Sequence, residues 1–166
     1  MITCKSTSRK SRGRKPNGLG MSAPAEPHSW VCKRLYDGLS IITREKNKLE
    51  ISNLDREAPV YRWGKVGEIK PDIAYFSSVE KVSLMDVSYT KPIFEIEVVN
   101  NHGKKPSFEN IKIVLQNVES MQEAFLYNYQ TQKWTRYTPS GELEPNKEES
   151  DYSSVFKVHL DILLSD

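Results

Sequence analysis

The feature that most constrains the fold is a series of two apolar strand-like segments and a helix between Lys70 and Lys112. The first segment, residues 73–76, follows a Pro-Asp pair. The second, residues 93–99, is rich in the β-branched and aromatic residues that are typical of strands. Ser107 has the composition of an N-cap, and apolar residues at helical spacing predict that the helix it begins runs to about residue 117. Strands followed by an amphipathic helix predict a mixed α/β domain around a central sheet.

The segments on either side of this series are predicted to complete the domain. Helical spacing of apolar residues predicts a first helix over residues 29–46. Residues 124–129 and 134–138 read as the two strands of a hairpin, because a short polar turn separates them. Residues 77–90 are predicted to form an irregular connection that contains a weak strand or turn, and the polar, acidic residues 139–151 are predicted to form a loop.

The chain divides into a basic tail and a mildly acidic body. Residues 1–25 hold six of the 24 basic residues and no acidic residue, which leaves 18 basic and all 22 acidic residues to the remainder. Residues 1–28 lack apolar periodicity and are predicted to be disordered. Such charge asymmetry is typical of an arm that seeks a polyanion, and a solvated leader without a binding role explains it equally well.

Part of this tail resembles an AT-hook. Arg12 and Arg14 flank Gly13, and arginines of such a motif enter the narrow minor groove of A·T-rich DNA. Lys15 stands before the proline, so the match is imperfect. Short basic strings also serve as nuclear localisation signals. Met21 is an alternative start that would delete the arm.

Cysteine usage and hydropathy indicate an intracellular protein. Cys4 and Cys32 match no metal or redox spacing, which is simplest in a reducing compartment. The chain contains no run of about 18 apolar residues, so no membrane span is expected. The N-terminus also lacks the apolar core of a secretory signal. The basic tail favours the nucleus, where the cell has one, and the cytoplasm otherwise.

Three acidic side chains form the first candidate site. Residues i and i+2 of a strand share one face, so Glu95 and Glu97 are expected side by side. Pairing of the two central strands would bring Asp72 near Glu97. Either this face is solvated, or the acids hold a hard cation such as Mg²⁺ or Mn²⁺. Such an ion would offset their repulsion and could activate a water molecule.

Lysines near this face are the second set of candidates. Lys112 lies on or beside the apolar stripe of its helix, where it either snorkels to solvent or reaches the acids. Lys104 and Lys105 follow the second strand, and they either contact nucleic-acid phosphates or belong to an ordinary charged loop. His28 and His159 are assigned no partner.

Taken in this order, the segments KPDIAYF (70–76) and FEIEVV (94–99) and the helix with Lys112 resemble the PD-(D/E)XK nuclease superfamily. More closely, they resemble the Uma-type restriction endonuclease family. The resemblance covers about residues 60–164. It implies a restriction-endonuclease-like domain over residues 29–166, with a shortened N-terminal part. It also implies Mg²⁺-dependent cleavage of DNA, in a superfamily whose members often act as homodimers.

The resemblance also implies roles for individual residues. Asp72 and Glu97 match the two metal-binding acids. Val99 occupies the strand position where classical members keep a lysine, so Lys112 on the following helix would supply that group. In a second register, Glu95 is the second acid and Glu97 takes the lysine position. Both registers place the second acid on the same face of the strand, so the alternation of side chains does not distinguish them. The family pattern favours the first register.

Three functional hypotheses follow. The first is a metal-dependent DNA endonuclease that uses Asp72, Glu97 and Lys112. The second is a catalytically inactive nuclease-fold module that binds nucleic acid or protein, with most of its DNA affinity in the basic arm. The third is an intracellular interaction protein that has no role with nucleic acid.

Overall fold

The computed structural model describes residues 27–45, 54–56, 61–62, 68–81, 87–141 and 143–165. Two α-helices and one short 3₁₀-helix lie among these residues, and none of them is long and apolar enough to cross a membrane. The elements, in chain order, are α1 (Pro27–Glu45), β1 (Leu54–Arg56), β2 (Tyr61–Arg62), β3 (Glu68–Ile69), β4 (Ile73–Lys81), β5 (Val87–Val99), α2 (Lys104–Asn117), β6 (Glu123–Asn128), β7 (Lys133–Thr138), β8 (Asn146–Glu148), β9 (Tyr152–Ser153), β10 (Val158–His159) and η2 (Leu160–Leu163).

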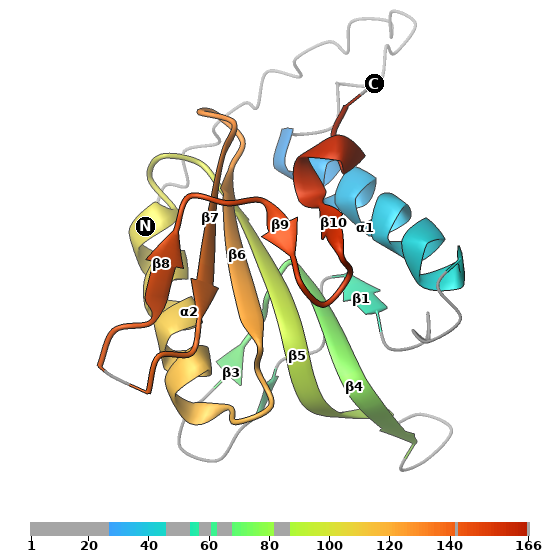
Figure 1. Cartoon of the computed structure of the whole chain (residues 1–166), viewed down its shortest axis with the longest axis vertical. Helices are drawn as coiled ribbons and strands as arrows, with labels where there is room; N and C mark the ends of the chain where they lie inside the picture. The colour runs from blue at the N-terminus through green and yellow to red at the C-terminus, as the bar shows by residue number, and fades with distance from the viewer. Residues whose placement is uncertain are drawn as a thin grey trace, which may run out of the picture.

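A mixed sheet forms the centre of the domain. Its six described strands lie in the order β1-β4-β5-β6-β7-β8 (Figure 1). β5 pairs antiparallel with β4 and parallel with β6, and α2 makes the crossover between β5 and β6. β6 and β7 form the antiparallel hairpin that the sequence predicts. The predicted mixed α/β fold is therefore confirmed.

The sheet is covered on both faces, and alternation along β5 assigns each side chain to one face. Phe94, Ile96 and Val98 belong to a core cluster beneath α1, which also includes residues of η2. Val99 belongs to a second cluster beneath α2. Figure 1 shows the two helices on either side of the sheet, with the C-terminal segment beside α1. Because residues two apart share a face, Glu95 and Glu97 lie on the α2 side with Val99.

The C-terminal segment explains a glycine that helix propensity alone disfavours. A Cβ atom at Gly38 in α1 would lie 2.9 Å from Leu163 Cδ2 in η2. The same segment is held to the sheet by Glu123, which is fully buried. Its carboxylate accepts bonds from the hydroxyl and the backbone N–H of Ser154, and it forms an ion pair with Arg136 of β7.

Several local predictions were wrong. α1 includes Pro27 and His28, which were predicted to belong to the disordered tail, while residues 1–26 lie outside the described part of the chain. The supposedly irregular residues 77–90 include the end of β4 and the start of β5, whose long antiparallel pairing satisfies their backbone groups. The predicted loop 139–151 contains β8, which pairs with β7.

Candidate functional site

Asp72 occupies the point where β4 begins beside β5. It follows Pro71 in a bend, and the next residue, Ile73, pairs with Ile96. The Asp72 Oδ2 atom accepts a 2.8 Å hydrogen bond from the backbone N–H of Val98. This bond fixes the carboxylate against β5, next to Glu97. The predicted proximity of Asp72 and Glu97 follows from this register.

Glu95 and Glu97 are buried beneath α2. The exposed fractions of these residues are 1% and 7%, respectively. Glu97 receives a side-chain hydrogen bond from Ser107 of α2. Ser107 was expected to be the N-cap of this helix, but the helix begins at Lys104 with Gly103 as its N-cap, so Ser107 lies within its first turn. A solvated face, one of the two explanations for these glutamates, is therefore wrong.

Burial makes the charged forms of both glutamates costly. Desolvation and the nearby Asp72 charge raise the pKa of Glu97 to about 8, against a partly compensating hydrogen bond from Ser107. Desolvation, with the Glu97 charge, raises the pKa of Glu95 well above its ordinary value. Among the described side chains, the Oε2 atom of Glu95 has no hydrogen-bond partner. No described basic side chain is among the groups that shift the pKa of either glutamate, so no cation from these residues offsets the charge of Glu95 or Glu97.

This arrangement fits a divalent metal ion. Asp72 and Glu97 offer carboxylate oxygens, which are the ligands that Mg²⁺ and Mn²⁺ prefer. A cation between them would offset the Asp72 repulsion, which adds to burial in raising the pKa of Glu97. Glu95 is more deeply buried than Glu97, and the Glu97 charge adds to burial in raising the pKa of Glu95. The acids therefore form a row in which Asp72 is the most exposed member.

Lys112 does not join this row. Its Nζ forms an ion pair with Glu144, and that hydrogen bond is the main reason for its raised pKa. The carboxylates that act on Lys112 are those of Glu144 and Glu109. Gln116, one turn later in α2, donates to the backbone oxygen of Leu143. The 143–144 segment is thus joined to α2, and the Lys112 side chain is directed to it.

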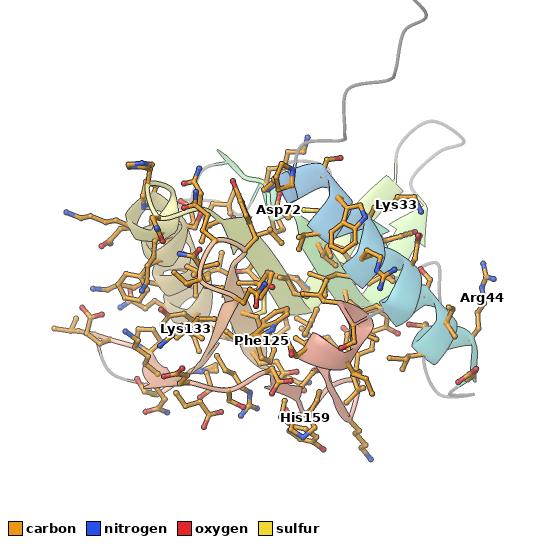
Figure 2. All side chains as sticks on the ribbon, turned by 90° about the horizontal axis from the view of Figure 1, so that it is seen from above. Lys33, Arg44, Asp72, Phe125, Lys133 and His159 are labelled. Carbon is orange, nitrogen blue, oxygen red and sulfur yellow. The ribbon has the colours of Figure 1, made fainter. Side chains whose placement is uncertain are left out.

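Two residues from α1 complete the surroundings of Asp72. The Nε2 atom of His28 lies 3.3 Å from Asp72 Oδ1, and the Cys32 sulfur lies 3.8 Å from His28 Nδ1. Figure 2 shows Asp72 beside the first turn of α1. From sequence, His28 was assigned no partner and Cys32 matched no metal spacing. Their i, i+4 spacing on a helix was the local signal, because such residues share one face.

Basic residues line a hollow near the start of α2. It has a volume of about 360 Å³, and its lining includes Lys104, Lys105 and Lys147. The first two were candidates for phosphate contacts, whereas Lys147 was not identified from sequence because it comes from the distant β8. The tail candidates Arg12 and Arg14 lie outside the described residues.

The fold has a clear match among solved structures. No protein-family model matches the chain, and no curated protein matches its sequence. The chain superposes with a TM-score of 0.62 on the crystal structure of a protein from Anabaena variabilis ATCC 29413, described as a candidate nuclease of the family DUF820. The match covers 87% of this chain and 84% of that chain, at 15% sequence identity. DUF820 is the Uma-type family, so the resemblance seen in the sequence is confirmed at the level of the restriction-endonuclease-like fold.

Proposed function

We propose that this protein is a metal-dependent endonuclease that hydrolyses phosphodiester bonds of DNA. The observation that carries the proposal is the convergence of Asp72 and Glu97 at the junction of β4 and β5, where burial, together with the Asp72 charge, raises the pKa of Glu97 to about 8. A buried acid without a neighbouring cation lowers the stability of the fold. Such acids are common at functional sites, where the chemistry requires them. The fold of a candidate nuclease is consistent with this proposal.

Asp72 and Glu97 are the proposed ligands of Mg²⁺ or Mn²⁺. The bound ion would supply charge stabilisation to the phosphoryl group in the transition state and lower the pKa of its water. Asp72 is held for this task by the Val98 N–H, and Glu97 is held by Ser107. We favour Glu97 over Glu95 as the second ligand, because Glu97 is the glutamate on which the Asp72 charge acts.

The lysines have two proposed tasks. Lys104 and Lys105 lie one turn or less before Ser107 and would contact DNA phosphates, as would Lys147 across the same hollow. Lys112 would assist the attacking water, which requires that it leave Glu144. That ion pair is solvent-exposed at Glu144, so DNA phosphates could compete for the lysine at low cost.

A second candidate function is an inactive nuclease-fold module that binds nucleic acid or protein. The pairing of Lys112 with Glu144 favours it, because no lysine among the described residues pairs with Asp72, Glu95 or Glu97, and Val99 occupies the strand position. In such a module the hollow and the tail would provide salt-dependent DNA binding without cleavage.

Nicking of supercoiled plasmid in Mg²⁺ or Mn²⁺ distinguishes these functions. We expect wild-type protein to nick and the Asp72→Asn and Glu97→Gln variants to lose nicking. Both amides keep a hydrogen-bond acceptor, so the Val98 and Ser107 bonds are retained. Asp37→Asn is the matched control, since Asp37 is an exposed acid of α1 that pairs with Lys33.

Each alternative result has a clear reading. Wild-type nicking that persists in Asp72→Asn would refute the proposed metal site. Nicking lost in Asp72→Asn and kept in Lys112→Ala would remove the lysine from the mechanism. A folded wild type that binds DNA without nicking would establish the inactive module.

A further inference from the structure

A second set of ligand atoms meets at Asp72 from the opposite face of the sheet. His28 and Cys32 are separated by one turn of α1, and a ligand atom of each lies near the Asp72 carboxylate. One ligand atom from each of the three residues lies within 4.8 Å of the other two. Among the residues that the structure describes, this is the one group of three or more histidine, cysteine and acidic side chains with such spacing.

The distances within this group are close to those of a tetrahedral zinc site. Zinc bonds of 2.0–2.3 Å at tetrahedral angles place a sulfur about 3.6 Å from a nitrogen, and a nitrogen about 3.4 Å from an oxygen. The Cys32 Sγ atom lies 3.9 Å from His28 Nε2, and that nitrogen lies 3.3 Å from Asp72 Oδ1. Both distances are close to the tetrahedral values, and the Cys32 and Asp72 ligand atoms lie within 4.8 Å of each other.

The chemistry of the donors separates this group from the carboxylate pair. Thiolate and imidazole ligands prefer Zn²⁺ and similar borderline cations, whereas Mg²⁺ prefers oxygen. Three protein ligands leave one tetrahedral position open. Cys32 and Asp72 are largely covered, while the His28 side chain is 43% exposed, so an ion could enter from the His28 side.

A histidine beside an aspartate is not sufficient to indicate a metal site. The chain contains another such pair, in which His159 Nδ1 lies 2.9 Å from Asp151 Oδ1 at the surface. That pair belongs to no group of three ligands among the described residues. The thiol of Cys32 therefore distinguishes the group at Asp72, and the His159–Asp151 pair provides an internal control. Figure 2 shows His159 and Asp72 on opposite sides of the domain.

We propose that His28, Cys32 and Asp72 form a binding site for Zn²⁺. The ion would deprotonate the Cys32 thiol on binding, and it would occupy the Oδ1 side of Asp72 while Oδ2 keeps its bond to the Val98 N–H. Because Asp72 is also the proposed ligand of Mg²⁺, Zn²⁺ at this site would compete with the hard ion and inhibit cleavage. This last consequence, unlike zinc binding itself, rests on the proposed function.

Cobalt substitution tests the site without reference to activity. Co²⁺ replaces Zn²⁺ in such sites, and a Co²⁺–thiolate bond gives strong charge-transfer absorption in the near ultraviolet. We expect one equivalent of Co²⁺ to produce this band in the full-length protein, and one equivalent of Zn²⁺ to remove it. The band should be absent in Cys32→Ser and present in Cys4→Ser, which removes the only other thiol.

Zinc affinity, measured by competition with a chromophoric chelator, provides the second measurement. We expect His28→Ala to weaken Zn²⁺ binding at least about tenfold, since even the loss of a residue that supports a metal ligand has effects of that size. His28 is partly exposed, so this variant should fold even if Cys32→Ser does not. The matched variant His159→Ala should bind Zn²⁺ with unchanged affinity.

The outcomes separate this proposal from the nuclease proposal. A thiolate band that persists in Cys32→Ser, or equal Zn²⁺ affinity in wild type and His28→Ala, would overturn the zinc site. Zinc binding with the expected losses in a protein that never nicks DNA would establish the zinc site and refute the nuclease. Glu97→Gln should leave Zn²⁺ binding unchanged, because Glu97 is not among the three ligands.

Discussion

The Glu97→Gln substitution should remove a pH-dependent loss of stability. Burial and the Asp72 charge raise the pKa of Glu97 from 4.5 to about 8 in the folded protein. Between these two pH values the folded state binds a proton that the unfolded state has released, so the free energy of unfolding falls as pH rises. Below the lower value both states are protonated and the effect is absent.

The size of this effect follows from the shift. Each pH unit between the two pKa values corresponds to about 1.4 kcal/mol, so the metal-free wild type should lose about 3 kcal/mol between pH 4.5 and pH 7 through Glu97 alone. Glutamine carries no charge at any of these pH values and can still accept the bond from Ser107. The variant should therefore match the wild type near pH 4.5 and exceed its stability near pH 7.

Urea unfolding with a chelator present, at several pH values from about 4.5 to about 8, provides the assay. We expect the difference in unfolding free energy between Glu97→Gln and wild type to grow with pH and to level off above about pH 8. Curves that run parallel over this range would refute the reasoning, because they would mean that Glu97 ionises as readily in the folded protein as in the unfolded chain. Asp37→Asn should give such a parallel curve.

Three further predictions concern single residues. Glu123→Gln should lower the unfolding free energy by about 3 kcal/mol near pH 7, since it disrupts a buried ion pair. The pKa of Glu123 is lowered from 4.5, so urea unfolding should show this difference disappear as pH falls through the lowered value. Asp72→Ala should destabilise the fold by about 1–3 kcal/mol more than Asp72→Asn, because alanine leaves the Val98 N–H without its acceptor, and thermal unfolding would show equal losses if that bond were unimportant. Glu144→Gln should raise the plasmid-nicking rate if Lys112 assists the reaction, since it weakens the pair that holds the lysine, and an unchanged rate would argue against that role.

The strand-level arrangement of the acids could be predicted from sequence, because it depends on short-range rules. Alternation along one strand places Glu95 and Glu97 on one face, and pairing of the two strongest strands brings Asp72 beside Glu97. Which face of the sheet a helix would cover could not be predicted from these short-range rules. The burial of both glutamates results from the crossover helix α2, and that packing depends on the whole domain.

Contacts between distant segments account for the predictions that were wrong or absent. His28 and Asp72 are 44 residues apart and meet only because α1 packs on the sheet beside the start of β4. Lys112 was expected on or beside the apolar stripe, but its partner, Glu144, comes from a segment whose position depends on β7 and β8. Ser107 matched the composition of an N-cap, although the helix begins one turn earlier.

Titration calorimetry of Mn²⁺ binding tests the central claim most directly. If Asp72 and Glu97 hold the ion, binding near pH 7 must displace the proton of Glu97, because its pKa is about 8. Measurements in two buffers of different ionisation enthalpy should then show release of about one proton per ion. Glu97→Gln should bind weakly and release none, while Cys32→Ser should match the wild type. Equal Mn²⁺ affinity in wild type and Glu97→Gln, without proton release, would contradict the assignment of this site.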